Sequence, residues 1–526
     1  MDLVASRQLA TRREWFGLVV LVLPCLLVSM DLSVLFYALP FLSADLAPSS
    51  SQLLWILDLY GFVLAGFLIT MGTLGDRIGR RKVLLAGAAL FGLASIAAAY
   101  AQSTEMLIVA RALLGIAGAT LAPSTLSLIR NMFHDPRQRQ VAVSVWTLGF
   151  AGGAIVGPII GGFMLEHFWW GSVFLLNVPV MVLLLVLGPI LLPEFRSPTA
   201  SRFDLFGSVL SLATILPMIY GVKKLAADGF AWGYVGSIAL GLAFGALFLR
   251  RMSTAEHPMI DVRLFRRVQF SGAVVACAIT FLVLAGLGMF VSQYLQLVLG
   301  YGPLKAALWS LPGMAGMFVG VSVATGIAAK IKPSLIVATG LTLGGLGFVL
   351  FAQVSVESGV GWVVASQLVM AAGIGAVATI ATDLVLATVP KESAGAAAAI
   401  SETANEFGGA TGIALLGSLG AVVYRSELEQ TAPAGLPGET LAQAKETLGS
   451  AFEVAATLPT ALGDALRFAA SSTFVDGLRW VAWIGAGGSV LIAAFVLVVL
   501  RRVPPTAPNT PSTHTVPNGG GPDPAR

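Results

Sequence analysis

The sequence predicts an all-α protein that crosses a membrane many times, and three observations lead to this fold class. Of the 526 residues, 56% are hydrophobic and only 11% are charged, with a mean hydropathy of +0.86. Soluble domains carry about 25% charged residues, so a soluble chain of this composition would expose far too much apolar surface. The apolar residues fall into long uncharged runs, and a backbone in lipid must satisfy its own hydrogen bonds, which requires helices. The alternating pattern of a membrane β-barrel is absent.

Fourteen stretches are apolar enough, and near enough to the required length of about 20 residues, to cross the hydrocarbon layer as helices. The first two, at about 15–40 and 51–74, each contain one carboxylate, Asp31 and Asp58 respectively. The other twelve carry no Asp, Glu, Lys or Arg and lie at 83–104, 112–129, 140–165, 167–193, 205–222, 229–249, 268–304, 306–329, 333–356, 358–382, 407–424 and 480–500.

The Lys and Arg residues between these spans predict the orientation, because cytoplasmic connections carry an excess of them. With the N-terminus inside, 22 of the 31 Lys and Arg residues fall in cytoplasmic connections, Arg526 lies in the tail and Arg111 lies within a span. Seven fall outside: Lys223, Lys224, Lys305, Arg425, Lys445, Arg467 and Arg479. A miscount by one span would scramble this bias, so it supports fourteen helices with both termini in the cytoplasm.

Internal echoes of two sequence patterns indicate a repeated architecture, which is a trait of transporters. GTLGDRIGRRKVL at 72–84 is faintly repeated at 326–340, and the glycine-rich span 140–165 is echoed by EFGGATGIALLGS. We expect a cytoplasmic N-terminus (1–14), a six-helix bundle (15–193), two inserted helices (205–250), a second six-helix bundle (268–501) and a disordered cytoplasmic tail (502–526). The second bundle contains a long extracytoplasmic loop, 425–473. Its helical periodicity predicts either an exposed amphipathic hairpin or a lid at the outer mouth.

Ionisable residues inside the spans are the candidate functional residues, because each costs about 2.5–3.5 kcal/mol at a helix centre on insertion scales. At 1.5 Å per residue, Asp31, Asp58 and Arg111 lie about 14, 10 and 9 Å below the outer helix ends. This similar depth predicts a shared cluster, in which either acid can pair with Arg111. Glu402 and Glu406 lie on one helix face, with no basic partner apparent in any span. Asp383 is expected at the cytoplasmic interface.

Several motifs together resemble the major facilitator superfamily, and more narrowly its fourteen-helix drug:proton antiporters, the QacA-like and LfrA-like multidrug pumps. GTLGDRIGRR resembles the family's motif between the second and third helices, and RALLGIAGATLAP, from Arg111, resembles its fourth-helix motif. GGAIVGPIIGG resembles the antiporter motif, although Ser144 stands where a further glycine is often found. MDLSVLFYALP, with Asp31, and WILDLYGFVLAGF, with Asp58, resemble segments of these pumps. The conformational motif residues are Gly75, Asp76, Arg77, Gly79, Arg80, Arg81, Gly149, Gly153, Gly157, Pro158, Gly161 and Gly162.

The resemblance implies a major facilitator fold in the bacterial inner membrane and proton-driven export by alternating access. The expected cargo is lipophilic cations: quaternary ammonium compounds and dyes such as ethidium and acriflavine, with fluoroquinolones as a further class. We expect a carboxylate to bind either a proton or the cation. The expected proton-coupling residues are Asp31, Arg111 and Glu402. The expected cation-recognition residues are Asp58, Glu406, Tyr37, Trp55 and Tyr60, with Phe36 nearby in sequence.

Two other classes of function remain open from the residues alone. One is an exporter of a metabolite, peptide or lipid, although anionic cargo would favour more basic residues in the spans than Arg111. The other is a membrane enzyme or receptor. The histidines and the two cysteines form no metal or catalytic spacing, and no GxxxxGK[ST] loop is present for ATP. We therefore expect no cofactor, metal or nucleic acid, and nothing in the sequence requires more than a monomer.

Overall fold

A computed structural model describes residues 9–196, 204–255, 262–387 and 394–500. Within these ranges fourteen helices are long and apolar enough to cross a membrane, and no strand is present. The predicted number of spans and the all-α class are thus confirmed. The predicted disordered tail lies outside the described residues.

The N-terminal half supplies six spans, and local capping explains where several begin. The Ser49 hydroxyl accepts a hydrogen bond from the backbone N–H of Gln52, and the Gln52 side-chain oxygen accepts one from the backbone N–H of Ser49. Asp135 caps the helix that starts at Pro136. The helices are α1 (Arg12–Leu46), α2 (Ser50–Ile78), α3 (Arg80–Ala99), α4 (Thr104–Met132), α5 (Pro136–His167), α6 (Ser172–Leu175) and α7 (Asn177–Leu191), of which α6 and α7 share one span.

Two inserted helices follow, α8 (Leu205–Asp228) and α9 (Trp232–Thr254). Their cytoplasmic ends are joined by an ion pair of 2.7 Å between Asp204 and Arg251. Partial burial raises the pKa of Asp204, but the hydrogen bonds from Arg251 and from the N–H of Gly207 outweigh burial, so its pKa is lowered. Gly241 and Met252 are the buried residues of α9, and the rest of this helix is exposed or half-buried, as expected for a helix at the lipid boundary.

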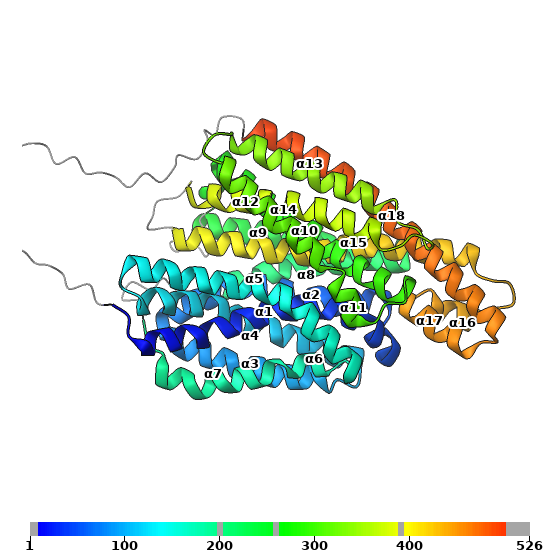
Figure 1. Ribbon diagram of the computed structural model, residues 1–526, viewed down its shortest axis with the longest axis horizontal. Helices are drawn as coiled ribbons and strands as arrows, with labels where there is room; N and C mark the ends of the chain where they lie inside the picture. Colours follow the sequence, from blue (N-terminus) through cyan, green and yellow to red (C-terminus); the bar gives the residue numbers. More distant parts are fainter. Residues whose placement is uncertain (1–8, 197–203, 256–261, 388–393, 501–526) are drawn as a thin grey trace, which may run out of the picture.

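The C-terminal half supplies the other six spans. Its elements are η1 (Leu264–Arg266), α10 (Val268–Gln293), the π-helical turn η2 (Tyr294–Val298), α11 (Pro303–Leu308), α12 (Leu311–Ile327), α13 (Pro333–Phe351), α14 (Gly361–Ala387), α15 (Ala394–Thr431), α16 (Gly438–Ala444), α17 (Leu448–Thr457) and α18 (Thr460–Val499). In Figure 1 the helices α1–α7 form one layer and those of the C-terminal half form the other. The start of α1 and the end of α18 lie at one end of the molecule, opposite α16 and α17.

The segment 425–473, for which the sequence predicts helical periodicity, is mostly helical, and the helices on either side extend further into it than the apolar runs predict. The helix α15 continues through Arg425 to Thr431, and α18 begins at Thr460, well before the predicted start of its span at 480. Charged residues end an apolar run without ending a helix, because a helix can continue into water. Between them, α17 buries Leu448, Ala451, Val454 and Ala455. The exposed-hairpin alternative is therefore wrong for α17, which packs on the outer end of the bundle.

Candidate functional site

A glycine stripe on α5 brings that helix close to α1, the helix that carries Asp31. A methyl group added to Gly149, Gly153, Gly157 or Gly161 would collide in turn with Val22, Leu26, Met30 or Val34 of α1. Both series advance by four residues, so the two helices run parallel with one face of each in contact. Ser29 adds a hydrogen bond of 2.6 Å from its hydroxyl to the carbonyl of Phe150. Pro158 lies within the same stretch of α5.

Arg111 of α4 pairs with Asp31 of α1, which settles the choice between the two predicted partners. Its Nη1 donates to the Asp31 carboxylate, and its Nε donates to the carbonyl of Ile56 on α2 at 2.9 Å. The guanidinium is fully buried and stacks over the ring of Tyr60, 4.5 Å from the centroid. One side chain therefore connects α1, α2 and α4. Arg111 Nη2 has no hydrogen-bond partner among the described residues.

Tyr60, Glu402 and Glu406 lie toward the boundary between the halves. Tyr60 is within electrostatic range of both Asp31 and Glu406. Ser401, next to Glu402, donates a hydrogen bond of 3.6 Å to the sulfur of Cys277 on α10, and a methyl group added at Gly61 of α2 would lie 3.7 Å from the carbonyl of Glu406, so this part of α15 faces the N-terminal half. Glu402 accepts a long hydrogen bond of 3.5 Å from Asn405. Among the described contacts, no basic side chain pairs with either glutamate.

Asp58 is paired with Lys223 of the inserted helix α8, which corrects the placement of Lys223 in an outer loop. The two charged groups meet at 2.6 Å, and both side chains are fully buried. The Lys223 ammonium also lies 3.8 Å from the centroid of the Trp55 ring. Asp58 and Trp55, which were predicted to recognise cargo, thus both contact a cation that belongs to the chain itself.

The other aromatic candidates lie where the halves meet toward the outside. Tyr37 donates a hydrogen bond of 2.7 Å to Ser310, which precedes α12. The carbonyl of Phe36 accepts one of 2.8 Å from Ser292 of α10. Gly162 of α5 approaches Leu304 of α11 so closely that an added methyl group would collide with it. These contacts close the outer side of the molecule between its halves.

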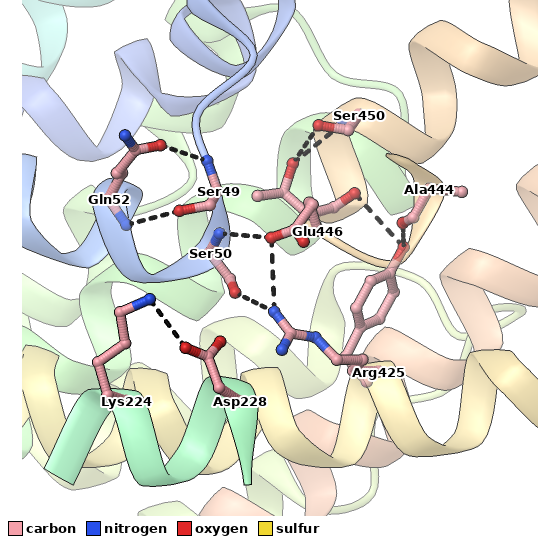
Figure 2. A network of polar contacts seen from close by, with 11 residues as sticks. Ser49, Ser50, Gln52, Lys224, Asp228, Arg425, Ala444, Glu446 and Ser450 are labelled. Atoms are coloured by element: carbon pink, nitrogen blue, oxygen red, sulfur yellow. Dashed lines mark hydrogen bonds and ion pairs between the residues drawn. The ribbon is translucent and has the colours of Figure 1, made fainter. Parts of the chain in front are cut away.

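A polar network above this closure joins α2 to the segment around α16 and α17 (Figure 2). Glu446 accepts from the backbone N–H of Ser50 at 3.0 Å and lies 3.4 Å from Arg425 of α15. Arg425 also donates to the Ser50 hydroxyl at 2.6 Å. The Tyr424 hydroxyl donates to the carbonyl of Ala444 at 3.0 Å. Ser50 belongs to the N-terminal half and Arg425 to the C-terminal half, so Glu446 bridges the two.

The motif at Gly75–Arg81 forms the cytoplasmic turn between α2 and α3. Arg80 pairs with Asp76 at 2.7 Å and donates to the carbonyl of Pro123 on α4, while Arg81 donates to the carbonyl of Leu192 after α7. Gly79 has φ 124°, and an added methyl group there would meet Glu194. Arg77 is exposed. The motif therefore fastens the cytoplasmic ends of four helices of the same half.

Two functional candidates, Lys223 and Glu446, are not among the residues that the sequence predicts for the site. Lys223 ends an uncharged run beside Lys224, a pattern that is typical of a connection between spans. Lys223 follows Ile219 by four residues and Ile215 by eight, so a helix that continues through Lys223 carries it on the same face as these two isoleucines. That helical spacing is the signal in the sequence that could have identified Lys223. Glu446 lies in a segment whose contacts no local pattern specifies. Among the described residues, no group of three His, Cys, Asp or Glu side chains is placed to hold a metal ion.

Comparison with known proteins agrees with this architecture. The model of the Major Facilitator Superfamily matches residues 22–413. Multidrug efflux pump LfrA of Mycolicibacterium smegmatis is 43% identical over 93% of this chain and 97% of its own. Methyl viologen resistance protein SmvA of Salmonella typhimurium is 35% identical over 92% and 97%. The tetracenomycin C resistance and export protein of Streptomyces glaucescens is 31% identical over 94% and 93%.

Solved structures show the same fold at low sequence identity. An inward-facing, unoccupied bacterial homologue of the human lysosomal transporter Spinster has a TM-score of 0.66 at 16% identity, covering 94% of this chain and 98% of its own. A peptide transporter POT in complex with sulfate has a TM-score of 0.63 at 16% identity, covering 93% and 95%. With its fourteen spans and bacterial relatives, this is a multi-pass protein of the bacterial inner membrane, and the chain belongs to the major facilitator superfamily.

Proposed function

We propose that the protein is a proton-driven efflux pump that exports lipophilic cations by alternating access between its two halves. The names of its relatives support drug export: a multidrug pump, a methyl viologen resistance protein and an antibiotic export protein. Methyl viologen is itself an organic dication. The proposed cargo accordingly comprises quaternary ammonium compounds, viologens and cationic dyes such as ethidium and acriflavine, with fluoroquinolones as a further class.

The observation that carries the proposal is the pair Glu402 and Glu406, two acids near the boundary of the halves with no basic partner among the described contacts. An uncompensated carboxylate within a membrane protein is costly, and either a proton or a bound cation removes that cost. A proton and a cationic substrate therefore compete for the same groups. This competition is the simplest way to exchange one for the other across the membrane.

Asp31 and Arg111 are proposed as the coupling pair. Protonation of Asp31 removes the charge that holds Arg111 Nη1 and weakens the connection between α1 and α4. The Arg111 guanidinium keeps its bond to Ile56 of α2, and its Nη2 has no hydrogen-bond partner in the described part of the chain. A proton entering from outside would in this way change the packing of α1, the helix that also contacts the C-terminal half through Tyr37.

The experiment is transport in proteoliposomes of the purified protein with an imposed pH gradient. We expect tetraphenylphosphonium and ethidium to move against the proton flux, with no movement when a protonophore collapses the gradient. Neutral and anionic dyes of similar size are the matched cargo controls, and protein-free liposomes give the leak. Cation movement that is indifferent to the pH gradient would contradict proton coupling, and movement of only the anionic or neutral cargo would contradict the substrate class.

An anionic cargo is not favoured, because both basic side chains found in the spans near the candidate site are already paired. Arg111 is neutralised by Asp31 and Lys223 by Asp58. Of the described residues in this region, the charged groups without an opposite partner are the carboxylates of Glu402 and Glu406. The fold shared with peptide transporters is compatible with other cargo, but it does not select among cargo classes.

A further inference from the structure

The inserted helix α8 is attached to α2 by three contacts in a single antiparallel register. Lys223 pairs with Asp58 at the outer end. In the middle, Leu212 fills the space beside Gly66, where an added methyl group would lie 2.8 Å from its Cγ. At the inner end the hydroxyl of Ser208 is hydrogen-bonded to that of Thr70. The contacts run along most of both helices, so α8 is fastened to α2 at both ends and in the middle.

Two of these contacts are polar and buried, which makes them costly to break. Asp58 and Lys223 are fully buried, and separating them would leave two uncompensated charges in the interior. The Trp55 ring beneath the ammonium adds a cation–π contact on the side of α2. Ser208 and Thr70 are also buried, so separating them would cost a buried hydrogen bond between the two helices.

The contact between α8 and α15 is apolar, in contrast to the polar contacts between α8 and α2. Ile219 lies in a small apolar cluster with Ala410 and Ala414 of α15 and with Phe62 of α2. Trp55, Ile215, Leu216 and Phe407 pack around this cluster. Apart from Phe407, the residues that α15 presents there are small, and α2 also approaches α15 closely, with Gly61 facing Ala410. Apolar side chains against small residues can change partners without leaving a charge or a polar group unsatisfied.

The helix α8 thus touches both halves along their boundary, at α2 on one side and α15 on the other. If the halves rock against each other, as the proposed function requires, one of these contacts must change in each cycle. We propose that α8, together with α9, travels as a rigid part of the N-terminal half, fixed by the Asp58–Lys223 pair, and slides over α15. The two inserted helices then move together with the layer formed by α1–α7.

This inference gives Asp58 a positioning role in place of the cation-recognition role predicted from the sequence. The Asp58 carboxylate is paired with the Lys223 ammonium, and the indole ring of Trp55 lies beside that ammonium. The groups that could bind a cationic substrate here therefore bind a cation of the protein itself. Lys223 is likewise a positioning residue.

A charge-pair series separates these two roles of Asp58. We expect Asp58→Asn and Lys223→Met each to reduce cation export by about tenfold or more, because each leaves one uncompensated buried charge. The double variant Asp58→Asn/Lys223→Met has neither charge, and we expect it to recover most of the export. If the double variant is folded, by size-exclusion profile, yet exports no better than Asp58→Asn, Asp58 takes part directly in transport and the positioning role is wrong.

Cross-linking tests the rigid attachment itself. In a background with Cys25→Ala and Cys277→Ala, Thr70→Cys/Ser208→Cys joins α2 to α8, and Ile219→Cys/Ala410→Cys joins α8 to α15. Gel mobility measures the linked fraction, and a short bis-maleimide replaces oxidation for a pair that forms no disulfide. We expect the first link to leave the transport rate within about twofold of the reduced protein, and the second to lower it about tenfold or more.

The reduced form of each variant separates this inference from the proposed function. If the reduced proteins show no gradient-driven cation transport, the proposed function fails. If they transport and the α2–α8 link stops them, or if the α8–α15 link leaves the rate unchanged, the rigid attachment is wrong. Only the combination of a tolerated α2–α8 link and an arresting α8–α15 link supports it.

Discussion

Arg111 donates to the carboxylate of Asp31 while its Nε is held by the carbonyl of Ile56, so three helices of the N-terminal half meet at one fully buried side chain. Depth along the helices predicted that Asp31 and Asp58 could both reach Arg111. Depth carries no information about rotation around the helix axis, and the rotation decides the pairing. Asp58 turns instead toward α8 and finds Lys223.

The first prediction concerns Asp31→Asn. Asparagine keeps the shape of the side chain but neither ionises nor compensates Arg111, so gradient-driven export of ethidium from proteoliposomes should fall to the leak rate. Exchange of labelled for unlabelled ethidium across the membrane, without a pH gradient, should persist because it needs no net proton movement. Asp31→Glu is the control and should retain part of the driven transport. Normal driven export by Asp31→Asn would remove Asp31 from the coupling mechanism.

The second prediction concerns the two glutamates. Glu402→Gln and Glu406→Gln should each weaken binding of tetraphenylphosphonium to the detergent-solubilised protein by about tenfold, corresponding to roughly 1.4 kcal/mol. Asp383→Asn is the matched control, since Asp383 is an exposed acid near the cytoplasmic end of α14 and should leave the affinity unchanged. Equal affinities for all three variants and the parent protein would mean that cargo is recognised elsewhere.

The glycine stripe offers a test with a control one residue away. Gly153→Ala places a methyl group against the backbone of Leu26 on α1, whereas Gly152→Ala places one in open space. Overpacking of this kind typically costs about 1–3 kcal/mol. We expect a lower apparent melting temperature and lower transport for Gly153→Ala, and parent-like values for Gly152→Ala. Similar melting temperatures for both variants would show that α1 and α5 are not in close contact.

The sequence predicted most of the fold because the number of spans depends on runs of apolar residues and on the side that carries Lys and Arg. It predicted that α5 presents a flat face, because glycine recurs at 149, 153, 157 and 161. It did not identify α1 as the partner, since the matching series Val22, Leu26, Met30 and Val34 has no distinctive composition. Lys223 was missed because a charge at the edge of an apolar run resembles a topology signal.

The last prediction concerns the outer closure. Glu446 joins Ser50 of α2 to Arg425 of α15, and a carboxylate at the start of α2 is also favoured by the helix dipole. Glu446→Ala should destabilise the outward-closed arrangement by about 1 kcal/mol, the usual contribution of one net hydrogen bond.

A cysteine at Ser292 can report opening of the outer side. Ser292 is buried and donates a hydrogen bond to the Phe36 carbonyl across the same boundary. We expect a membrane-impermeant maleimide added outside to label Ser292→Cys about fivefold faster when Glu446→Ala is also present. Glu439→Ala, on the exposed face of α16, is the control and should leave the labelling rate unchanged. Equal labelling with and without Glu446 would mean that the apolar contacts of α17, rather than this carboxylate, hold the outer side closed.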